Sequence, residues 1–386
     1  MKKLQFRAGD TEQNKLINAI VKTTQVITTI YTVLNQMFKH EGNQELIESL
    51  QTDARFNFNI LFHLLSFLYN KNLIELIKEL NENGTSDDNS FAMELLDDVV
   101  DENLKNLLMP ILEHARLDKK VKQLDYFFQT YIHSDKDAYY QILTGEYSQF
   151  SNWTRTLALD YLLRHNAPIN DEIMACLFHP IEIVRETCAR LIFEKAPERF
   201  TAFAARYNET EMDNLIFGIE KPSNSLLIEK VRFLKQNRYF KELSMYSLIN
   251  FAKEIEASDN EVFAENFLNF ILRKPVLIFK DQDLHINIHH KKIVFNDRVN
   301  LLDLEIIGDN SDITKFQPLP AIKFYSITKT RFKKVIFDNP EIGVALQKLK
   351  EEFFRDNEHI PIENMIVESI KPVNLPIEKK RIKHAN

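Results

Sequence analysis

The architecture of the first two-thirds of the chain can be inferred from the segment His179-Pro-Ile-Glu-Ile-Val-Arg-Glu-Thr-Cys-Ala-Arg-Leu-Ile192. Its apolar residues recur at steps of three and four, and a proline precedes them, which is typical of the start of an amphipathic helix. The segment from Asn152 to Leu162 has the same pattern. Its Arg155 corresponds to Arg185 at an offset of 30 residues. The two segments therefore predict a repeated helical unit.

Upstream segments show the same helical spacing. We expect helices over Leu16, Ile20, Ile27, Ile30, Val33, Leu34 and Met37, over Phe56, Ile60, Leu64, Leu65 and Leu68, over Leu95, Leu96 and Val99, and over Leu104, Leu107, Leu108 and Ile111. Residues 1–44 are predicted to form an amphipathic N-terminal helix. The polar segment 81–90 should separate two helices, with Ser90 and Asp101 as N-caps of the helices that follow them.

Composition narrows the class of protein. The chain has 386 residues, of which 44% are apolar, so two or three domains with buried cores are expected. A net charge of -7 disfavours general nucleic-acid binding, which needs a basic face. Only 7 glycines occur, which disfavours most phosphate-binding loops. The two cysteines, Cys176 and Cys188, are interpreted as buried thiols of a reducing compartment.

Neither a signal peptide nor a membrane span is predicted. No run of about 18 apolar residues occurs, and residues 4–11 carry Arg7 and Asp10 where a signal peptide would be apolar. We therefore expect a cytoplasmic protein. The basic tail Lys379–His384 is interpreted as a solvated segment, with contact to anionic lipid at the inner face of the membrane as the alternative.

The pattern changes to period two in the last third. Leu284, Ile286 and Ile288 alternate with polar residues, which predicts a half-buried strand. Further strands are expected at 276–279 and 322–327, with a hairpin turn at 281–283 joining the first two strands. Helices are predicted at 329–337 and 341–354, and an irregular segment from 356 onwards.

Two resemblances follow from these residues. Val184-Arg185 followed by Ala189, with Arg155 and Ala158 as a second unit, resembles the second-helix signature of HEAT repeats. An irregular helical bundle is the alternative, because HEAT units usually run ~40–47 residues. Residues 222–355 resemble a cyclic-nucleotide-binding domain in the order of their elements. The similar segments are Leu226–Lys235, Leu243–Ala252, Glu261–Phe263, Phe270–Leu272, Val276–Phe279, Ile327–Phe332 and Asn339–Ile342.

The second resemblance implies a β-roll of the jelly-roll type with flanking helices, whose nucleotide pocket is degenerate. In that family a Gly-Glu pair begins a short helix and a nearby arginine neutralises the cyclic phosphate. Here Leu302 stands at the glycine position and Asp303 at the glutamate position, and the arginine position falls near Ser311 or Asp312. We therefore expect no binding of cyclic nucleotide, with an altered ligand as the alternative.

A third resemblance concerns the order of the domains. Residues 58–69, 91–98 and 104–112 resemble the soluble region that follows the membrane part in bacterial ATP/ADP-translocase-like transporters. In those fusions HEAT repeats and a cyclic-nucleotide-type domain follow in this order. The resemblance implies a transporter-associated regulatory module, and the transport chemistry itself is not carried over.

Other clusters of polar and aromatic residues do not indicate a catalytic or metal site. His285 and His289 would lie ~13 Å apart on one strand face, too far for one metal ion, and His290 would face the other way. Glu94, Asp97, Asp98, Asp101 and Glu102 are interpreted as a solvated acidic face. Trp153 and the phenylalanine clusters are predicted to be core residues, with an exposed aromatic groove as the alternative.

The sequence thus predicts an α+β multidomain chain. We expect a HEAT-like helical repeat array over 45–221, a degenerate cyclic-nucleotide-binding-like domain over 222–355 and an irregular basic tail. No catalytic residue, metal site or cofactor is assigned. The predicted function is that of a non-enzymatic regulatory or scaffolding protein with a protein partner. The alternative is a small-molecule or nucleotide sensor that regulates a nucleotide transporter.

Overall fold

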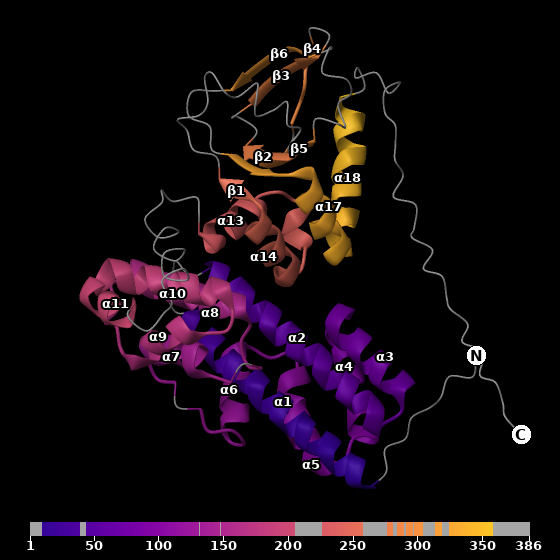
Figure 1. Ribbon diagram of the computed structural model, residues 1–386. Helices are drawn as coiled ribbons and strands as arrows, with labels where there is room; N and C mark the ends of the chain where they lie inside the picture. Colours follow the sequence, from indigo (N-terminus) through magenta and orange to yellow (C-terminus); the bar gives the residue numbers. More distant parts are fainter. Residues whose placement is uncertain are drawn as a thin grey trace, which may run out of the picture. The chain divides into compact units, whose positions relative to one another are not determined.

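The computed structural model divides the chain into two compact units, Met1–Ile228 and Glu229–Asn386 (Figure 1). It describes residues 10–38, 44–130, 132–146, 148–204, 226–257, 276–280, 284–288, 291–295, 297–303, 313–318 and 324–357. We call the two parts the helical unit and the C-terminal unit. The expected tail and the residues Glu261–Phe263 and Phe270–Leu272 lie outside the described residues.

The described part of the helical unit consists of helices joined by short connections. They are α1 (Asp10–Met37), α2 (Gln44–Leu68), α3 (Lys71–Asn83), α4 (Ser86–Val99), α5 (Glu102–Leu112), α6 (Leu117–Asp125), α7 (Asp135–Thr144), α8 (Asn152–Arg164), α9 (Asp171–Ala175), the 3-10 turn η1 (Cys176–Phe178), α10 (Glu182–Lys195) and α11 (Pro197–Ala204). Helix α1 packs along α2, and its residues Ile20 and Ile27 belong to the core of the unit. The N-terminal helix is therefore part of the helical unit.

Two arginines repeat the same structural role. Arg155 on α8 is buried, and its guanidinium donates to backbone carbonyls at the end of α7. Arg185 on α10 donates to the carbonyls of His179 and Pro180, just after η1, at 2.8 Å each. In both cases an arginine from one helix donates to backbone carbonyls at the end of the preceding helical segment or just after it. The offset of 30 residues in the sequence therefore corresponds to a repeated interaction.

Two cap predictions are corrected by the structure. Ser90 lies inside α4 and is not its N-cap; that position belongs to Thr85. Thr85 and Asp88 form a reciprocal capping box, in which the Thr85 amide donates to Asp88 at 2.7 Å. Asp101 does occupy the N-cap position of α5, but it makes no side-chain cap and instead accepts from the Tyr69 hydroxyl at 3.0 Å.

The predicted apolar face of α2 is partly wrong. Phe56 is 64% exposed, whereas the buried side of the helix is formed mainly by Leu50, Ala54, Leu61 and Leu65. The two sides differ because α2 carries apolar residues on more than one face, and only one face is covered by the helices around it. Trp153 and both cysteines are buried, as predicted. The phenylalanines are core residues only in part, because Phe91 and Phe178 are 50% and 58% exposed.

The C-terminal unit combines helices with two antiparallel sheets. Its described elements are α13 (Leu227–Leu234, which crosses the unit boundary), the 3-10 turn η2 (Phe240–Glu242), α14 (Met245–Glu254), β1 (Glu256–Ala257), β2 (Val276–Lys280), β3 (Leu284–Ile288), β4 (Lys291–Lys292), β5 (Val299–Asp303), β6 (Ile313–Pro318), β7 (Phe324–Ile327), α17 (Lys329–Asp338) and α18 (Pro340–Asp356). The described strands form the sheets β1-β7-β2-β5 and β4-β3-β6.

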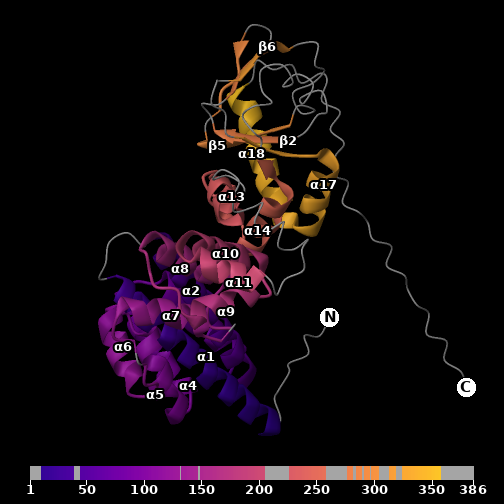
Figure 2. The same cartoon turned by 60° about the vertical axis from the view of Figure 1, so that its left-hand side comes forward.

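The four-stranded sheet is covered on both faces. Ile278 and Phe279 are neighbours on β2 and must point to opposite sides of the sheet, and both are fully buried. The three-stranded sheet lies over one face, and α13 and α14 lie over the other (Figures 1 and 2). The strands expected at 276–279, 284–288 and 322–327 correspond to β2, β3 and β7, and the two closing helices correspond to α17 and α18. The unit is an α+β structure.

The expected hairpin between 276–279 and 284–288 is wrong. Strand β2 pairs with β5 and β7, whereas β3 pairs with β4 and β6, so the two strands belong to different sheets. The two strands are close in the sequence, but this closeness does not make them pair with each other. No described helix combines the length and apolarity that crossing a membrane requires.

Candidate functional site

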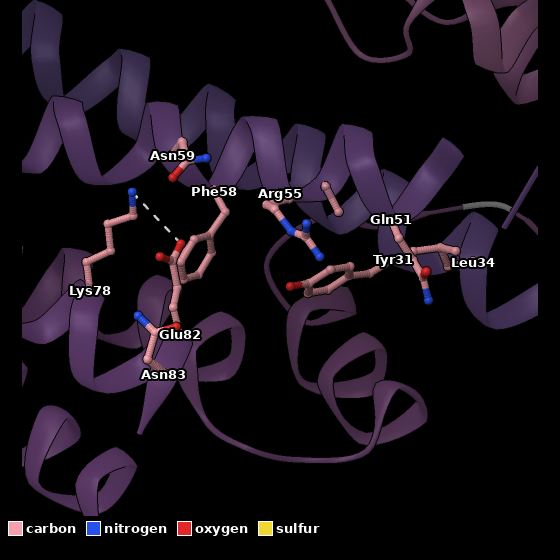
Figure 3. Close-up of a pocket in the computed structure, with 10 residues that line it drawn as sticks. Tyr31, Leu34, Gln51, Arg55, Phe58, Asn59, Lys78, Glu82 and Asn83 are labelled. Atoms are coloured by element: carbon pink, nitrogen blue, oxygen red, sulfur yellow. Dashed lines mark ion pairs between the residues drawn. The ribbon is translucent and has the colours of Figure 1, made fainter. Parts of the chain in front are cut away.

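A pocket of about 720 Å³ opens in the helical unit between α1, α2 and α3 (Figure 3). Its lining residues are Tyr31, Leu34, Gln51, Ala54, Arg55, Phe58, Asn59, Lys78, Glu82 and Asn83. The volume lies within the range of ~300–1,000 Å³ that is usual for small-molecule sites. Six of the ten lining residues are polar or charged, so the pocket is more polar than most small-molecule sites.

The local sequence explains why these three helices meet. Helix α2 ends at Leu68, and Asn70 then caps α3 by accepting from the amides of Asn72 and Leu73, at 3.0 and 3.4 Å. The connection is so short that α3 folds back beside α2. One side of α3 therefore faces the pocket side of α2 across the opening.

The pocket has an excess of positive charge. Lys78 and Glu82 form a long ion pair of 3.9 Å across one turn of α3. Arg55 is exposed at the rim, and among the described residues no carboxylate pairs with it. Since the only acidic lining residue already has a cationic partner, the arginine remains as an uncompensated charge.

Two neutral polar groups complete the polar wall. The Oδ1 atom of Asn59 is buried and has no hydrogen-bond partner among the described residues. Burial raises the pKa of Tyr31 to about 12, so its phenol stays neutral at ordinary pH. The Nζ atom of Lys120 lies 5.6 Å from the centroid of the Tyr31 ring and donates to the Ile111 carbonyl at 2.7 Å.

An apolar stripe lies on the exposed side of α2. It consists of Phe56, Ile60, His63 and Phe67, spaced by four, three and four residues. Phe56 is 64% exposed and Phe67 is 48% exposed, while Ile60 is half-buried and His63 is exposed. Residues with this spacing share one side of a helix, so the four side chains form a continuous strip, which we call the Phe56–Phe67 stripe.

A buried carboxyl group connects α2 to α8. Asp53 accepts from the Thr154 hydroxyl at 2.6 Å and from the Ser151 amide at 3.0 Å. Burial raises the pKa of Asp53, and these hydrogen bonds oppose the effect. The group has protein partners at the N-terminus of α8, so its role is to hold two helices together.

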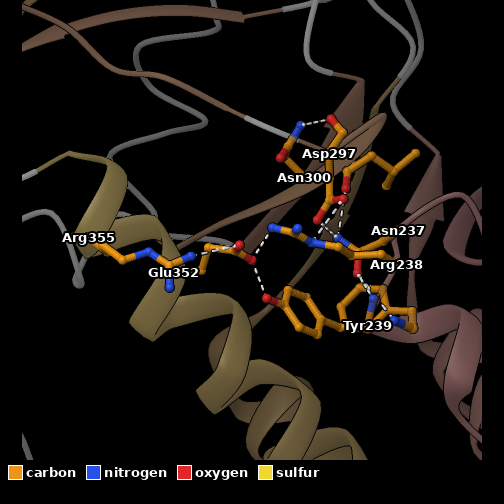
Figure 4. Close-up of polar contacts among 9 residues, drawn as sticks. Asn237, Arg238, Tyr239, Asp297, Asn300, Glu352 and Arg355 are labelled. Atoms are coloured by element: carbon orange, nitrogen blue, oxygen red, sulfur yellow. Dashed lines mark hydrogen bonds and ion pairs between the residues drawn. The ribbon is translucent and has the colours of Figure 1, made fainter.

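A second polar cluster fixes α18 in the C-terminal unit (Figure 4). Glu352 accepts from Tyr239 and pairs with Arg238 and Arg355. Those hydrogen bonds and charges, the Tyr239 bond first, lower the pKa of Glu352. Arg238 also approaches Asp297 at 3.4 Å, so α18 is joined to the connection between α13 and η2 and to the segment before β5.

Two of the four predicted ligand-pocket positions belong to the described residues. Leu302 and Asp303 belong to strand β5, where they pair in register with Leu277 and Val276. Ser311 and Asp312 lie outside the described residues, as do His289 and His290. Half of the predicted set is therefore placed, and it lies in a β-strand.

The acidic residues of α4 and α5 are engaged in ordinary contacts. Lys105 pairs with Asp97 and, at 3.5 Å, with Glu102. Within the described part of the chain, no group of three or more His, Cys, Asp or Glu side chains is placed to hold a metal ion. The pocket between α1, α2 and α3 was missed by the sequence analysis, because it corresponds to no motif. The sequence offered the Phe56–Phe67 stripe only as the general alternative of an exposed aromatic groove, without its residues.

Comparison with known proteins does not assign the chain to a family. No protein-family model matches it, and no curated protein shows significant sequence similarity to it. The function is therefore argued from the residues themselves.

Proposed function

We propose that this chain is a non-enzymatic regulatory or scaffolding protein whose helical unit binds a protein partner. The observation that carries the proposal is the Phe56–Phe67 stripe. Two large aromatic side chains on one side of a long helix, Phe56 and Phe67, are 64% and 48% exposed. Exposed apolar residues that are contiguous mark interaction surfaces more often than isolated ones do.

The spacing of the stripe indicates what kind of partner fits it. Steps of four, three and four residues are those of a coiled-coil seam, in which a second helix lies along the first. Covering the exposed part of each phenylalanine ring is worth about 2–3 kcal/mol of transfer free energy. The expected partner is therefore an amphipathic helix, and His63 provides a polar position within the seam.

For the C-terminal unit we propose a supporting role without binding of cyclic nucleotide. The position of Leu302 and Asp303 in a strand supports this, because backbone amides engaged in a β-ladder are not free to hold a phosphate. Calorimetric titration of the full chain with cyclic AMP, cyclic GMP and ATP is the test. Micromolar binding of a cyclic nucleotide would favour the sensor function instead.

The identity of the partner is proposed from the resemblance alone. The order of a helical array and a β-roll resembles the soluble part of bacterial ATP/ADP-translocase-like transporters, so a nucleotide transporter is the first candidate. A chain with this role would act at the inner face of the membrane.

The stripe can be tested by photo-crosslinking in cells that express the full chain. Benzoylphenylalanine replaces Phe56 or Phe67 in turn, and Tyr126, which is 85% exposed and outside the stripe, serves as the control position. We expect the same protein adduct from both stripe positions and none from the control. Equal labelling at all three positions, or adducts only between copies of this chain, would contradict the proposal.

A further inference from the structure

We propose that the pocket between α1, α2 and α3 binds a small organic anion, a carboxylate or a phosphate, that also carries a hydrogen-bond donor. This inference is independent of the partner proposed for the Phe56–Phe67 stripe. It rests on three features of the pocket: an uncompensated charge, an unsatisfied acceptor and an aromatic wall.

The charged side chains of the pocket favour a negatively charged ligand. Glu82 is already paired with Lys78 at 3.9 Å, whereas Arg55 has no carboxylate partner among the described residues. A guanidinium presents parallel N–H donors that match the two oxygens of a carboxylate or phosphate. A cation would meet repulsion from both basic side chains.

A buried acceptor in the pocket wall favours a ligand that also carries a hydrogen-bond donor. A buried polar atom without a partner costs about 1–3 kcal/mol, so such atoms are rare in stable proteins. The Oδ1 atom of Asn59 is in this state in the described structure, and Asn59 lines the pocket one helical turn after Arg55. A ligand N–H or O–H group at this point would satisfy it.

The remaining wall suits the body of an organic molecule. Phe58 is half-buried, and its ring packs on Phe62 with centroids 4.9 Å apart, so its position in the wall is fixed. Tyr31 adds a second ring with a neutral hydroxyl (Figure 3). An inorganic ion would leave most of the 720 Å³ filled by water, whereas a metabolite would contact both rings.

Titration calorimetry on the full chain tests the proposal with three probes. Adenosine 5′-monophosphate supplies a phosphate, donors and a ring, L-glutamate supplies carboxylates and an ammonium donor, and inorganic phosphate supplies the charge alone. We expect at least one organic probe to bind more tightly than inorganic phosphate. Binding of the nucleotide alone identifies a phosphate ligand, and binding of glutamate alone identifies a carboxylate ligand. Failure of both organic probes would overturn the proposal.

Three variants locate the binding. Arg55→Ala should weaken it by about ten-fold or more, since charge-assisted hydrogen bonds are strong. Arg116→Ala removes an equal charge on an exposed side chain outside the pocket and should leave affinity unchanged. Glu82→Gln should strengthen binding of the anion, because it removes the one negative charge of the wall.

Asn59 separates a binding role from a structural one. Asn59→Leu removes the unsatisfied acceptor, so the ligand-free protein should keep or gain thermal stability while it loses affinity. A residue with a merely structural role would instead lower the melting temperature when replaced. Equal affinity in the wild type, Arg55→Ala and Asn59→Leu would place any observed binding elsewhere. Crosslinking at the Phe56–Phe67 stripe serves as a separate readout, so the two proposals can fail independently.

Discussion

Replacing Arg155 by alanine should destabilise the helical unit far more than the same change at Arg185. The Arg155 side chain is 3% exposed. It donates to the carbonyls of Ile142, Leu143 and Gly145 at 3.0 Å each and of Glu146 at 2.8 Å. The change removes these bonds, leaves carbonyls at the end of α7 unpaired and opens a cavity.

The magnitude follows from the number and burial of these contacts. A hydrogen bond to a charged group contributes about 1.5–3 kcal/mol, but four that share one guanidinium are not additive, so we expect a loss of about 3–5 kcal/mol. Arg185 is half-buried and donates to two carbonyls, so its replacement should cost about 1–2 kcal/mol. Arg155→Lys should lie between, because one ammonium cannot reach four carbonyls.

The chain offers a local probe for this measurement. Its single tryptophan, Trp153, is 2% exposed on α8, so its fluorescence reports unfolding of the helical unit. Urea unfolding of the full chain, followed by this signal, gives the free energy for each variant. If Arg155→Ala were no less stable than Arg185→Ala, the carbonyl contacts would not be the reason for its burial.

Three further outcomes are expected. Thr85→Ala should lower the free energy of urea unfolding by about 1 kcal/mol, because Thr85 caps α4. Ser90→Ala should lower it by less than about half of that, because Ser90 lies inside the helix. Equal losses in the two variants would contradict the capping box. Burial raises the pKa of Asp53 above 3.8, so the folded state binds more protons than the unfolded state, and its contribution to stability falls as pH rises from about 3.8 through the raised value. Asp53→Asn should abolish this loss of stability with rising pH. If the variant kept the pH profile of the wild type, Asp53 would not be the group responsible. Glu352→Ala should increase the rate of hydrogen exchange in α18 by about five- to ten-fold. Replacing the exposed neighbour Glu351 by alanine should leave the rate unchanged. Equal exchange rates in the two variants would show that the polar cluster around Glu352 does not anchor α18.

Local patterns predicted the elements well because each element depends on neighbouring residues. The spacing of apolar residues gave the helices α8 and α10, and alternation gave β3. The start of α4 was misplaced at Ser90 because a cap depends on a specific partner. Thr85 wins that position since Asp88, three residues on, can return the hydrogen bond to its amide.

Pairing and pockets could not be predicted in the same way. Strands β2 and β3 are neighbours in the sequence but belong to different sheets, since β2 aligns with β5 and β7 over long separations. The pocket combines Tyr31, Arg55 and Lys78 from three helices. Such a set has no fixed spacing along the chain, so only the packing of the helices brings it together.

The exposed face of α2 shows where periodicity stops being informative. The helix has enough apolar residues to cover two sides, and the sequence cannot tell which side the unit will bury. The other helices of the unit cover the side of Leu50, Leu61 and Leu65, whereas Phe56 and Phe67 stay 64% and 48% exposed. The same helix carries the Phe56–Phe67 stripe and Arg55, the charge of the pocket wall that no carboxylate of the described residues compensates. Consecutive residues of a helix point about 100° apart, so Phe56 and Arg55 place the stripe and the pocket on different sides of α2.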